Sequence, residues 1–131
     1  MSEPVWLMKT AMMAAHDMLI ARFGGPAGVR SEELLESALA RPQNLFHYEG
    51  QTSLAHLAAA YAAGITGNHP FVDGNKRSGF LAAFMFLDLN GATLTADEIS
   101  ATTMTMGLAA GEIDEATYGN WLADNIELRS E

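Results

Sequence analysis

The sequence predicts an all-α fold, a compact bundle of about six helices around a central buried helix, in a single domain spanning residues 1–131. Three observations support this prediction. Apolar residues recur at helical spacing along most of the chain, and the segments between them carry the Gly, Pro, Ser and Asp residues that cap helices or form turns. With 131 residues, of which 49% are hydrophobic, the chain has the size of one domain and can bury a core.

Composition excludes several classes of function. The 7 Lys and Arg residues are outnumbered by 16 Asp and Glu residues, and the formal charge of -9 argues against direct nucleic-acid binding, which needs a basic face. The absence of cysteine excludes disulfides, cysteine-based zinc sites and thiol catalysis. Residues 1–9 lack the features of a signal peptide, and the longest apolar segment, Gly79 to Leu87, is too short to span a bilayer. We therefore expect a soluble, cytoplasmic protein.

The first helix is predicted from about Met8 to Phe23, after a short extended segment and before a Gly-Gly pair that ends it. Its methionine-rich apolar stripe is typical of adaptable core packing. We expect His16 and Asp17 to have structural roles. The glycine-rich segment 24–28 lacks the Gly-Lys-Ser/Thr ending of a Walker loop, so we interpret it as a turn.

The second helix is expected to begin at the N-cap Ser31, with two glutamates in its first turn, and to end at Arg41-Pro42. Between Gln43 and Gln51 no helical period is visible. The part from Leu45 to Tyr48 is therefore either extended or part of a surface loop.

The third helix is capped by Thr52 or Ser53 and is predicted to run to about Thr66, with Gly64 and Gly67 loosening and ending it. Alanines make nearly all of its surface small, which permits the close approach of another helix. The expected partner is the helix that follows.

The fourth helix starts at Asp73 or Gly74 and stops at Asn90-Gly91. It is apolar on nearly every side, which predicts that it is the central buried helix of the bundle. A binding site at its start would therefore be held on a rigid, packed element.

The fifth helix is predicted from a capping box formed by Thr95 and Glu98 and runs to about Ala110. The sixth starts at Asp114 and contains the apolar residues of the last helical stretch. The tail from Glu127 onward is expected to be frayed.

The chemistry is concentrated in one stretch, which leads directly into the fourth helix and reads His69-Pro70-Phe71-Val72-Asp73-Gly74-Asn75-Lys76-Arg77. The first backbone N–H groups of a helix lack intrahelical acceptors and lie at the positive end of the helix dipole, so they favour a bound anion such as phosphate. An amide, an ammonium and a guanidinium follow in the same turn and add three different donors. The candidate phosphate-binding residues are therefore Gly74, Asn75, Lys76 and Arg77.

His69 is the candidate base, because an imidazole can take a proton from an incoming hydroxyl near neutral pH, and Lys76 and Arg77 join it as candidate catalytic residues. Asp73 is the candidate metal ligand, since the magnesium of a nucleotide is usually held by one or two carboxylates and by phosphate oxygens. Each residue also has a structural alternative: a packed histidine, a turn or N-cap aspartate, or a solvated first turn. Their combination in fixed order at one helix start favours the functional interpretation.

This stretch resembles the signature of the Fic/Doc superfamily, and specifically of its Doc (death on curing) branch, whose motif is H-x-F-x-D-x-N-K-R. All specified positions match, namely His69, Phe71, Asp73, Asn75, Lys76 and Arg77. The motif of the adenylylating Fic enzymes, H-P-F-x-(D/E)-G-N-G-R-x-x-R, differs at two positions. Lys76 replaces its small Gly, and Phe80 stands where its second Arg handles the ATP phosphates during AMP transfer. Similarities outside the motif, such as Phe23-Gly24-Gly25 and Tyr61, extend the resemblance over most of the chain.

The resemblance implies a helical Fic/Doc fold and a toxin that uses ATP and magnesium to phosphorylate a Ser or Thr hydroxyl of a translation factor, with elongation factor Tu as the expected target. It also implies a flap, for which the segment from Gln43 to Gln51 is the candidate, and a Phd-like antitoxin whose C-terminal segment folds into a groove. Self-inhibited Fic proteins carry (S/T)-x-x-x-E-(G/N). Here Glu49 is the only Glu before Gly or Asn, and Leu45 stands four positions before it, so inhibition is expected from another chain.

Two alternatives to the kinase interpretation remain. One is an adenylyl- or other nucleotidyltransferase of the wider Fic class. The other is a catalytically silent module that uses the fold only to bind a partner.

Overall fold

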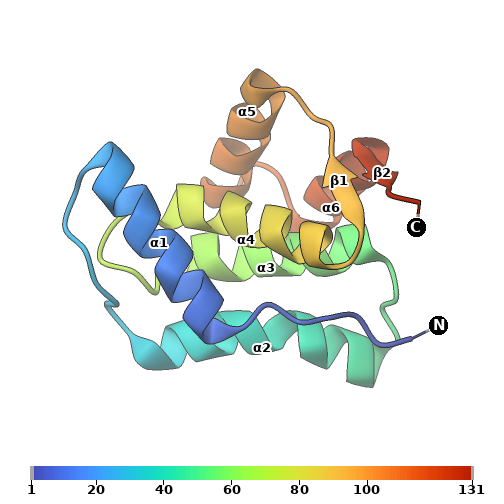
Figure 1. Ribbon diagram of the computed structural model, residues 1–131, viewed down its shortest axis with the longest axis horizontal. Helices are drawn as coiled ribbons and strands as arrows, with labels where there is room; N and C mark the ends of the chain where they lie inside the picture. Colours follow the sequence, from blue (N-terminus) through green and yellow to red (C-terminus); the bar gives the residue numbers. More distant parts are fainter. Residues whose placement is uncertain (1, 131) are drawn as a thin grey trace.

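The computed structural model describes residues 2–130, and within them the chain forms six helices and one small sheet, which confirms the predicted all-α class (Figure 1). Among these residues no helix is long and apolar enough to cross a membrane. The elements in chain order are α1 (Lys9–Phe23), α2 (Glu32–Glu49), α3 (Leu54–Asn68), α4 (Asn75–Leu89), β1 (Ala92–Leu94), α5 (Glu98–Ala109), α6 (Glu115–Asp124) and β2 (Ile126–Leu128).

The central helix is α3. Ten of its fifteen residues are buried, compared with seven of fifteen in α4, where Phe84 and Leu89 are exposed. It packs against α2, α4 and α6, and Figure 1 shows it between α2 and α4. The prediction that the motif helix is the central one is therefore wrong. The alanine-rich helix occupies the most crowded position because small side chains let several helices approach it closely.

Two glycines allow the backbones of α2 and α4 to approach that of α3 closely. A Cβ built on Gly64 would lie 3.1 Å from the Cα of Ala38 in α2, and one built on Gly79 in α4 would lie 3.2 Å from the carbonyl oxygen of Ala62. The expected close packing of α3 with the motif helix is thus confirmed. Gly64 lies inside α3 and does not loosen or end it, because its small size is used for contact with α2.

The second helix continues through Pro42 to its C-cap Gly50. Proline removes one backbone hydrogen bond from a helix, but Leu45 and Phe46, in the turn that follows, pack against the core and hold the helix together. The predicted helix end at this proline is therefore wrong. The predicted extended or looped flap between Gln43 and Gln51 is wrong as well, because residues 43–49 are helical.

The end of the chain departs from the sequence prediction at two points. Asp97, and not Thr95, is the N-cap of α5, because its carboxylate accepts a hydrogen bond from the N–H of Ser100 at 2.7 Å. Thr95 instead donates its hydroxyl to the carbonyl of Asn125. The predicted frayed tail is ordered up to β2, which pairs antiparallel with β1. The sixth helix begins after the N-cap Asp114, as predicted.

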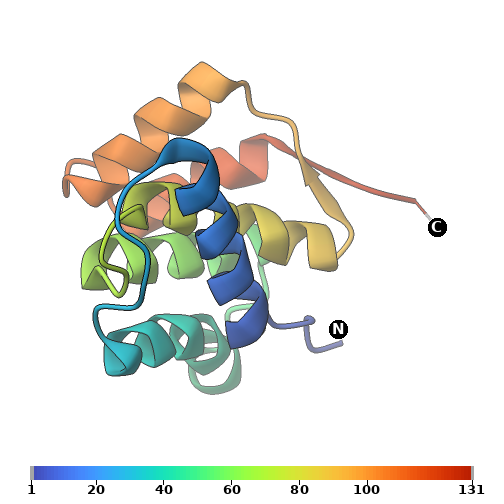
Figure 2. The ribbon, with the colours of Figure 1, turned by 60° about the vertical axis from the view of Figure 1, so that its left-hand side comes forward.

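The first helix positions the loops that matter for the site. It crosses the layer formed by α2, α3 and α4, and its C-terminal end lies near the start of α4 (Figures 1 and 2). The segment before it is tied to the core, since the N–H of Leu7 donates to the hydroxyl of Tyr61 at 3.0 Å. Burial of that phenol raises the pKa of Tyr61 to about 12, so it stays a neutral hydrogen-bonding group.

Candidate functional site

The predicted site residues lie on the connection from α3 to α4. His69 is the C-cap of α3 and Asn75 is the first residue of α4, so the motif spans one loop and one helical turn. The loop of residues 24–31, between α1 and α2, runs beside this connection, and an isolated bridge pairs Val29 with Phe71 (Figure 2). The candidate site is therefore built from two loops and the start of α4.

The backbone of His69 is held in an uncommon conformation. With φ 51° and ψ 55°, it is the one non-glycine residue with positive φ among residues 2–130. Its carbonyl accepts a hydrogen bond from Nε of Arg30 at 2.7 Å, and Nη2 of Arg30 reaches the carbonyl of Asn68 at 2.8 Å. Such strained residues persist only where their surroundings hold them, and they cluster at functional sites. The side chain of His69 is exposed, so the fold holds its backbone while its ring stays accessible.

The side chain of Asn75 ties the loop to the helix. Its Oδ1 accepts a hydrogen bond from the N–H of Phe71, and its Nδ2 donates to the carbonyl of Phe71, both at 3.0 Å. Asn75 is 9% exposed and Phe71 is 1% exposed. The Asn75 amide, which the sequence analysis counted among the phosphate donors, is thus turned to the loop, and only its backbone N–H remains at the helix start.

The start of α4 carries unused hydrogen-bond donors. Its N-cap is Gly74, in the left-handed region with φ 77°, and has no side chain with which to cap the helix. The backbone N–H groups of Asn75, Lys76 and Arg77 have no acceptor within residues 2–130. The starts of α2, α3, α5 and α6 are capped by the side chains of Ser31, Ser53, Asp97 and Asp114, whereas the start of α1, like that of α4, has no side-chain cap. Free N–H groups at the positive end of a helix dipole can bind phosphate oxygens.

Cations that form no ion pair gather at the same place. Of the seven Lys and Arg residues, three form ion pairs with carboxylates, namely Lys9, Arg41 and Arg129. Within the described part of the chain the other four form none, namely Arg22, Arg30, Lys76 and Arg77. The guanidinium of Arg77 lies 4.2 Å from the ring centroid of Phe23, and that of Arg22 lies 5.5 Å from it. In a protein of net charge -9, this basic cluster suits a small anion.

Asp73 lies against the neighbouring loop. Its Oδ1 accepts a hydrogen bond from the N–H of Gly74 at 2.8 Å, and a Cβ built on Gly25 would overlap its Oδ2. Within residues 2–130, no group of three or more His, Asp or Glu side chains converges to hold a metal ion. One exposed carboxylate beside a phosphate site is nevertheless the usual protein contribution to a magnesium ion that takes its other ligands from phosphate and water.

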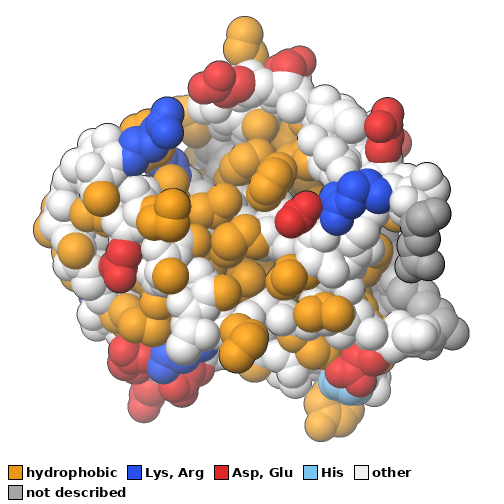
Figure 3. Space-filling view, viewed as in Figure 1, with side chains coloured by type: hydrophobic (Ala, Val, Ile, Leu, Met, Phe, Trp, Pro, Cys, Tyr) orange, Lys and Arg blue, Asp and Glu red, His pale blue; other side chains and the backbone are white. Residues whose placement is uncertain are grey.

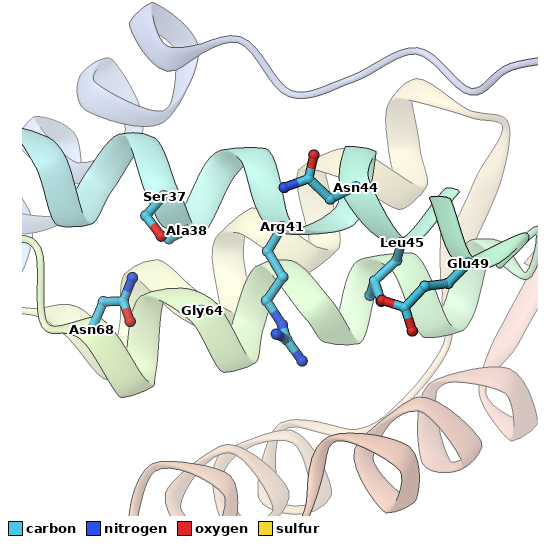
Figure 4. Close-up of a pocket in the computed structure, with 8 residues that line it drawn as sticks. All are labelled: Ser37, Ala38, Arg41, Asn44, Leu45, Glu49, Gly64 and Asn68. Atoms are coloured by element: carbon cyan, nitrogen blue, oxygen red, sulfur yellow. The ribbon is translucent and has the colours of Figure 1, made fainter. Parts of the chain in front are cut away.

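Two cavities of the described structure lie away from the motif. One of about 280 Å³, between α2 and α3, is lined by polar residues that include Arg41, Asn44, Glu49 and Asn68 (Figure 4). The guanidinium of Arg41 is already paired with the carboxylate of Glu115, at 2.6 Å. The other cavity, of about 370 Å³, lies between α2 and the segment that precedes α1. Neither cavity is lined by a residue of the motif, so the motif is marked as the site by its chemistry.

Sequence reasoning missed several residues that shape this site. Arg30 was assigned no role, His16 was assigned only a structural one, and Phe23 was noted only as part of the first helix and of the family resemblance. Each contacts the motif or the adjacent Ser78 across a long sequence separation, which is 39 residues for Arg30 to His69 and 62 for His16 to Ser78. No local pattern signals such contacts. The sole hint in the sequence that one of these residues belongs to the site was the resemblance of Phe23-Gly24-Gly25 to the Doc branch.

Comparisons with known proteins agree with the motif. The sequence profile described as the Fic/DOC family matches residues 6–87. The chain is 32% identical over 111 residues to the protein kinase doc of Escherichia phage P1, covering 85% of this chain and 87% of that protein. It is 40% identical over 92 residues to the toxin Doc of Mycolicibacterium smegmatis, covering 67% of this chain and 71% of that protein.

Proposed function

The chain belongs to the Fic/DOC family and, within it, to the Doc branch. From this premise we propose that it is the toxin of a toxin–antitoxin pair and that it transfers the γ-phosphate of ATP to a Ser or Thr hydroxyl of a translation factor. Elongation factor Tu is the expected target, and arrested translation is the expected result. The observation that carries the proposal is the start of α4, where three unpaired backbone N–H groups lie beside Lys76 and Arg77.

The start of α4 would hold the phosphates. The backbone N–H groups from Asn75 to Arg77 would donate to phosphate oxygens, and Gly74 would supply the left-handed backbone, with φ 77°, that leads into this helix start. Lys76 would add a mobile point charge, and Arg77 a planar fork that can bind one phosphate through two donors. Asp73 would supply the protein ligand to magnesium, which when bound neutralises charge that develops on the phosphates.

His69 would act as the base. Its imidazole would take the proton of the acceptor hydroxyl as the hydroxyl oxygen bonds to the γ-phosphorus. The bond from that phosphorus to the β–γ bridging oxygen then breaks, and ADP leaves. Phosphoryl transfer depends mainly on positioning and charge stabilisation. The contact of Arg30 with the His69 carbonyl at 2.7 Å supports the proposal, because it anchors the base next to the helix start.

Two positions favour phosphoryl transfer over AMP transfer. Lys76 adds a charge where the Fic motif has a small glycine, and Phe80 is half-buried where that motif has its second phosphate-handling arginine. The nucleotidyltransferase alternative still has support in the His-Pro-Phe and Asp-Gly-Asn parts of the motif, which fit both branches.

A labelling experiment separates these readings. The purified chain is incubated with magnesium, elongation factor Tu and either γ-labelled or α-labelled ATP, beside the variant His69→Ala. Label transferred only from γ-labelled ATP, and lost in the variant, is the expected result. Transfer from α-labelled ATP would overturn the kinase proposal in favour of a nucleotidyltransferase. A cellular effect that survives Arg77→Ala would instead indicate a binding module that does not use the phosphate cradle.

The antitoxin is proposed to cover an apolar hollow. Figure 3 shows hydrophobic side chains collected in the hollow between α1 and α5, above α4. Exposed large hydrophobic residues on these helices are Met18, Phe23, Phe84, Leu89, Ile99 and Met106. A Phd-like antitoxin segment that folds into an amphipathic helix could bury such a surface. If so, Phe84→Glu should leave toxicity intact and weaken neutralisation by the co-expressed antitoxin. Unchanged neutralisation would place the antitoxin elsewhere.

A further inference from the structure

We propose that His16 is a positioning residue for the phosphate cradle. Through contacts with Phe71, Gly74 and Ser78, it sets where the loop before α4 and the first turn of that helix lie. The kinetic part of this proposal rests on the proposed phosphoryl transfer, whereas its structural part does not.

One buried ring contacts two residues of the motif, Phe71 and Gly74, and also Ser78, the residue that follows the motif in α4. His16 of α1 is 1% exposed, and its ring stacks on Phe71 with centroids 3.8 Å apart and planes inclined by 9°. Its Nδ1 lies 2.9 Å from the hydroxyl of Ser78 in α4, a hydrogen bond between groups 62 residues apart. A Cβ built on Gly74 would lie 3.4 Å from its Cε1, so the ring also lies against the N-cap of α4.

Apolar packing alone does not account for a histidine here. Its Nε2 is buried without a hydrogen-bond partner in the described structure, and such an atom destabilises a fold. A phenylalanine would fill similar space without that penalty. The group that only histidine supplies is Nδ1, whose bond to Ser78 fixes the rotation of the ring. That rotation determines how the ring face meets Phe71 and how the ring edge meets Gly74.

The neighbouring residues transmit this position to the cradle. Phe71 is held by the side chain of Asn75, and Gly74 precedes the first free N–H group of α4. A rotated His16 ring would therefore shift the backbone donors of the cradle. Displacements on the order of 1 Å from a productive geometry can slow an enzyme up to about a hundredfold.

Two variants remove the hydrogen bond from opposite sides. His16→Phe keeps a stacked ring, and Ser78→Ala keeps the histidine. We expect each to lower kcat for phosphoryl transfer by about tenfold, with a smaller change in the KM for ATP. The double variant should be no slower than either single one, because both remove the same contact. The melting temperature should not fall in His16→Phe, because that variant also removes the unpartnered Nε2.

His56→Phe is the matched control. His56 also bonds two side chains, Ser53 at 3.0 Å and Asn120 at 3.1 Å, but it precedes His69 by 13 residues along α3, about 20 Å of helix. We expect its kcat to stay within about twofold of wild type, since it does not contact the motif.

Amide hydrogen exchange at residues 71–77, measured without nucleotide, tests the proposal independently of any activity. Exchange should be about tenfold faster in His16→Phe and in Ser78→Ala than in wild type, and unchanged in His56→Phe. Unchanged exchange in Ser78→Ala, or a kcat that stays at the wild-type level in both variants, would overturn the positioning role. A wild-type chain that transfers no phosphate would refute the proposed function alone, and the exchange data would still decide the role of His16.

Discussion

Replacing Asn75 by alanine should destabilise the fold through the loop and not through the core. The side chain of Asn75 makes two 3.0 Å hydrogen bonds to the backbone of Phe71, whose side chain is 1% exposed. Asn75→Ala leaves one N–H and one carbonyl without partners. A buried unsatisfied group costs roughly 1–3 kcal/mol, and water can reach part of this loop, so we expect a loss of about 2–4 kcal/mol in the free energy of unfolding.

Urea unfolding measures this loss, and Asn90→Ala is its control. The side chain of Asn90 clamps Val5 in the same way, accepting from its N–H at 2.8 Å and donating to its carbonyl at 2.9 Å, but at an exposed position. Water can replace those bonds, so we expect Asn90→Ala to cost about 0.5–1.5 kcal/mol. Phosphoryl transfer should be lost in Asn75→Ala and kept in Asn90→Ala.

Two results would refute this reasoning. Equal losses of stability in the two variants would show that burial of Phe71 does not raise the penalty. Full transfer activity in a folded Asn75→Ala would show that the loop holds its position without the clamp.

Three other perturbations test contacts around the site. Gly25→Ala should lower the melting temperature more than Gly24→Ala and should weaken magnesium-dependent transfer. Both glycines have positive φ, but only a Cβ at Gly25 would overlap Asp73. Equal melting temperatures of the two variants would contradict this prediction. Burial lowers the pKa of His16 from its ordinary value of 6.5, so the unfolded chain binds the extra proton and stability should fall as pH drops below 6.5. The urea midpoint should fall less steeply with decreasing pH in His16→Phe than in wild type. If the midpoints of the two proteins depend on pH in the same way, His16 is ruled out as the cause. Phe23→Leu removes the aromatic ring that lies 4.2 Å from the Arg77 guanidinium and should lower kcat about threefold. Arg22→Gln removes only the guanidinium that lies 5.5 Å from the Phe23 ring and should lower kcat less. Steady-state kinetics that show the reverse order would argue against a role for the ring.

Short-range patterns in the sequence were sufficient for much of this protein. Helical periodicity and capping residues predicted the all-α class and the starts of α2, α3 and α6, because N-caps act within three residues of chain. The candidate site is also local, since its residues follow one another from His69 to Arg77. A helix start collects its anion-binding groups within a single turn, so their chemistry can be recognised without the fold.

Long-range packing decided the rest. The small alanines of α3 allow it to be the central helix. Pro42 predicts the end of α2, but core contacts of the residues after Pro42 keep the helix continuous. The orientation of the motif depends on Arg30 and His16, which belong to other parts of the chain. These contacts join residues dozens of positions apart, and their free energy arises only when burial brings the elements together. The sequence alone therefore determined which groups could bind a phosphate, and the tertiary structure decided which of them remain free to do so.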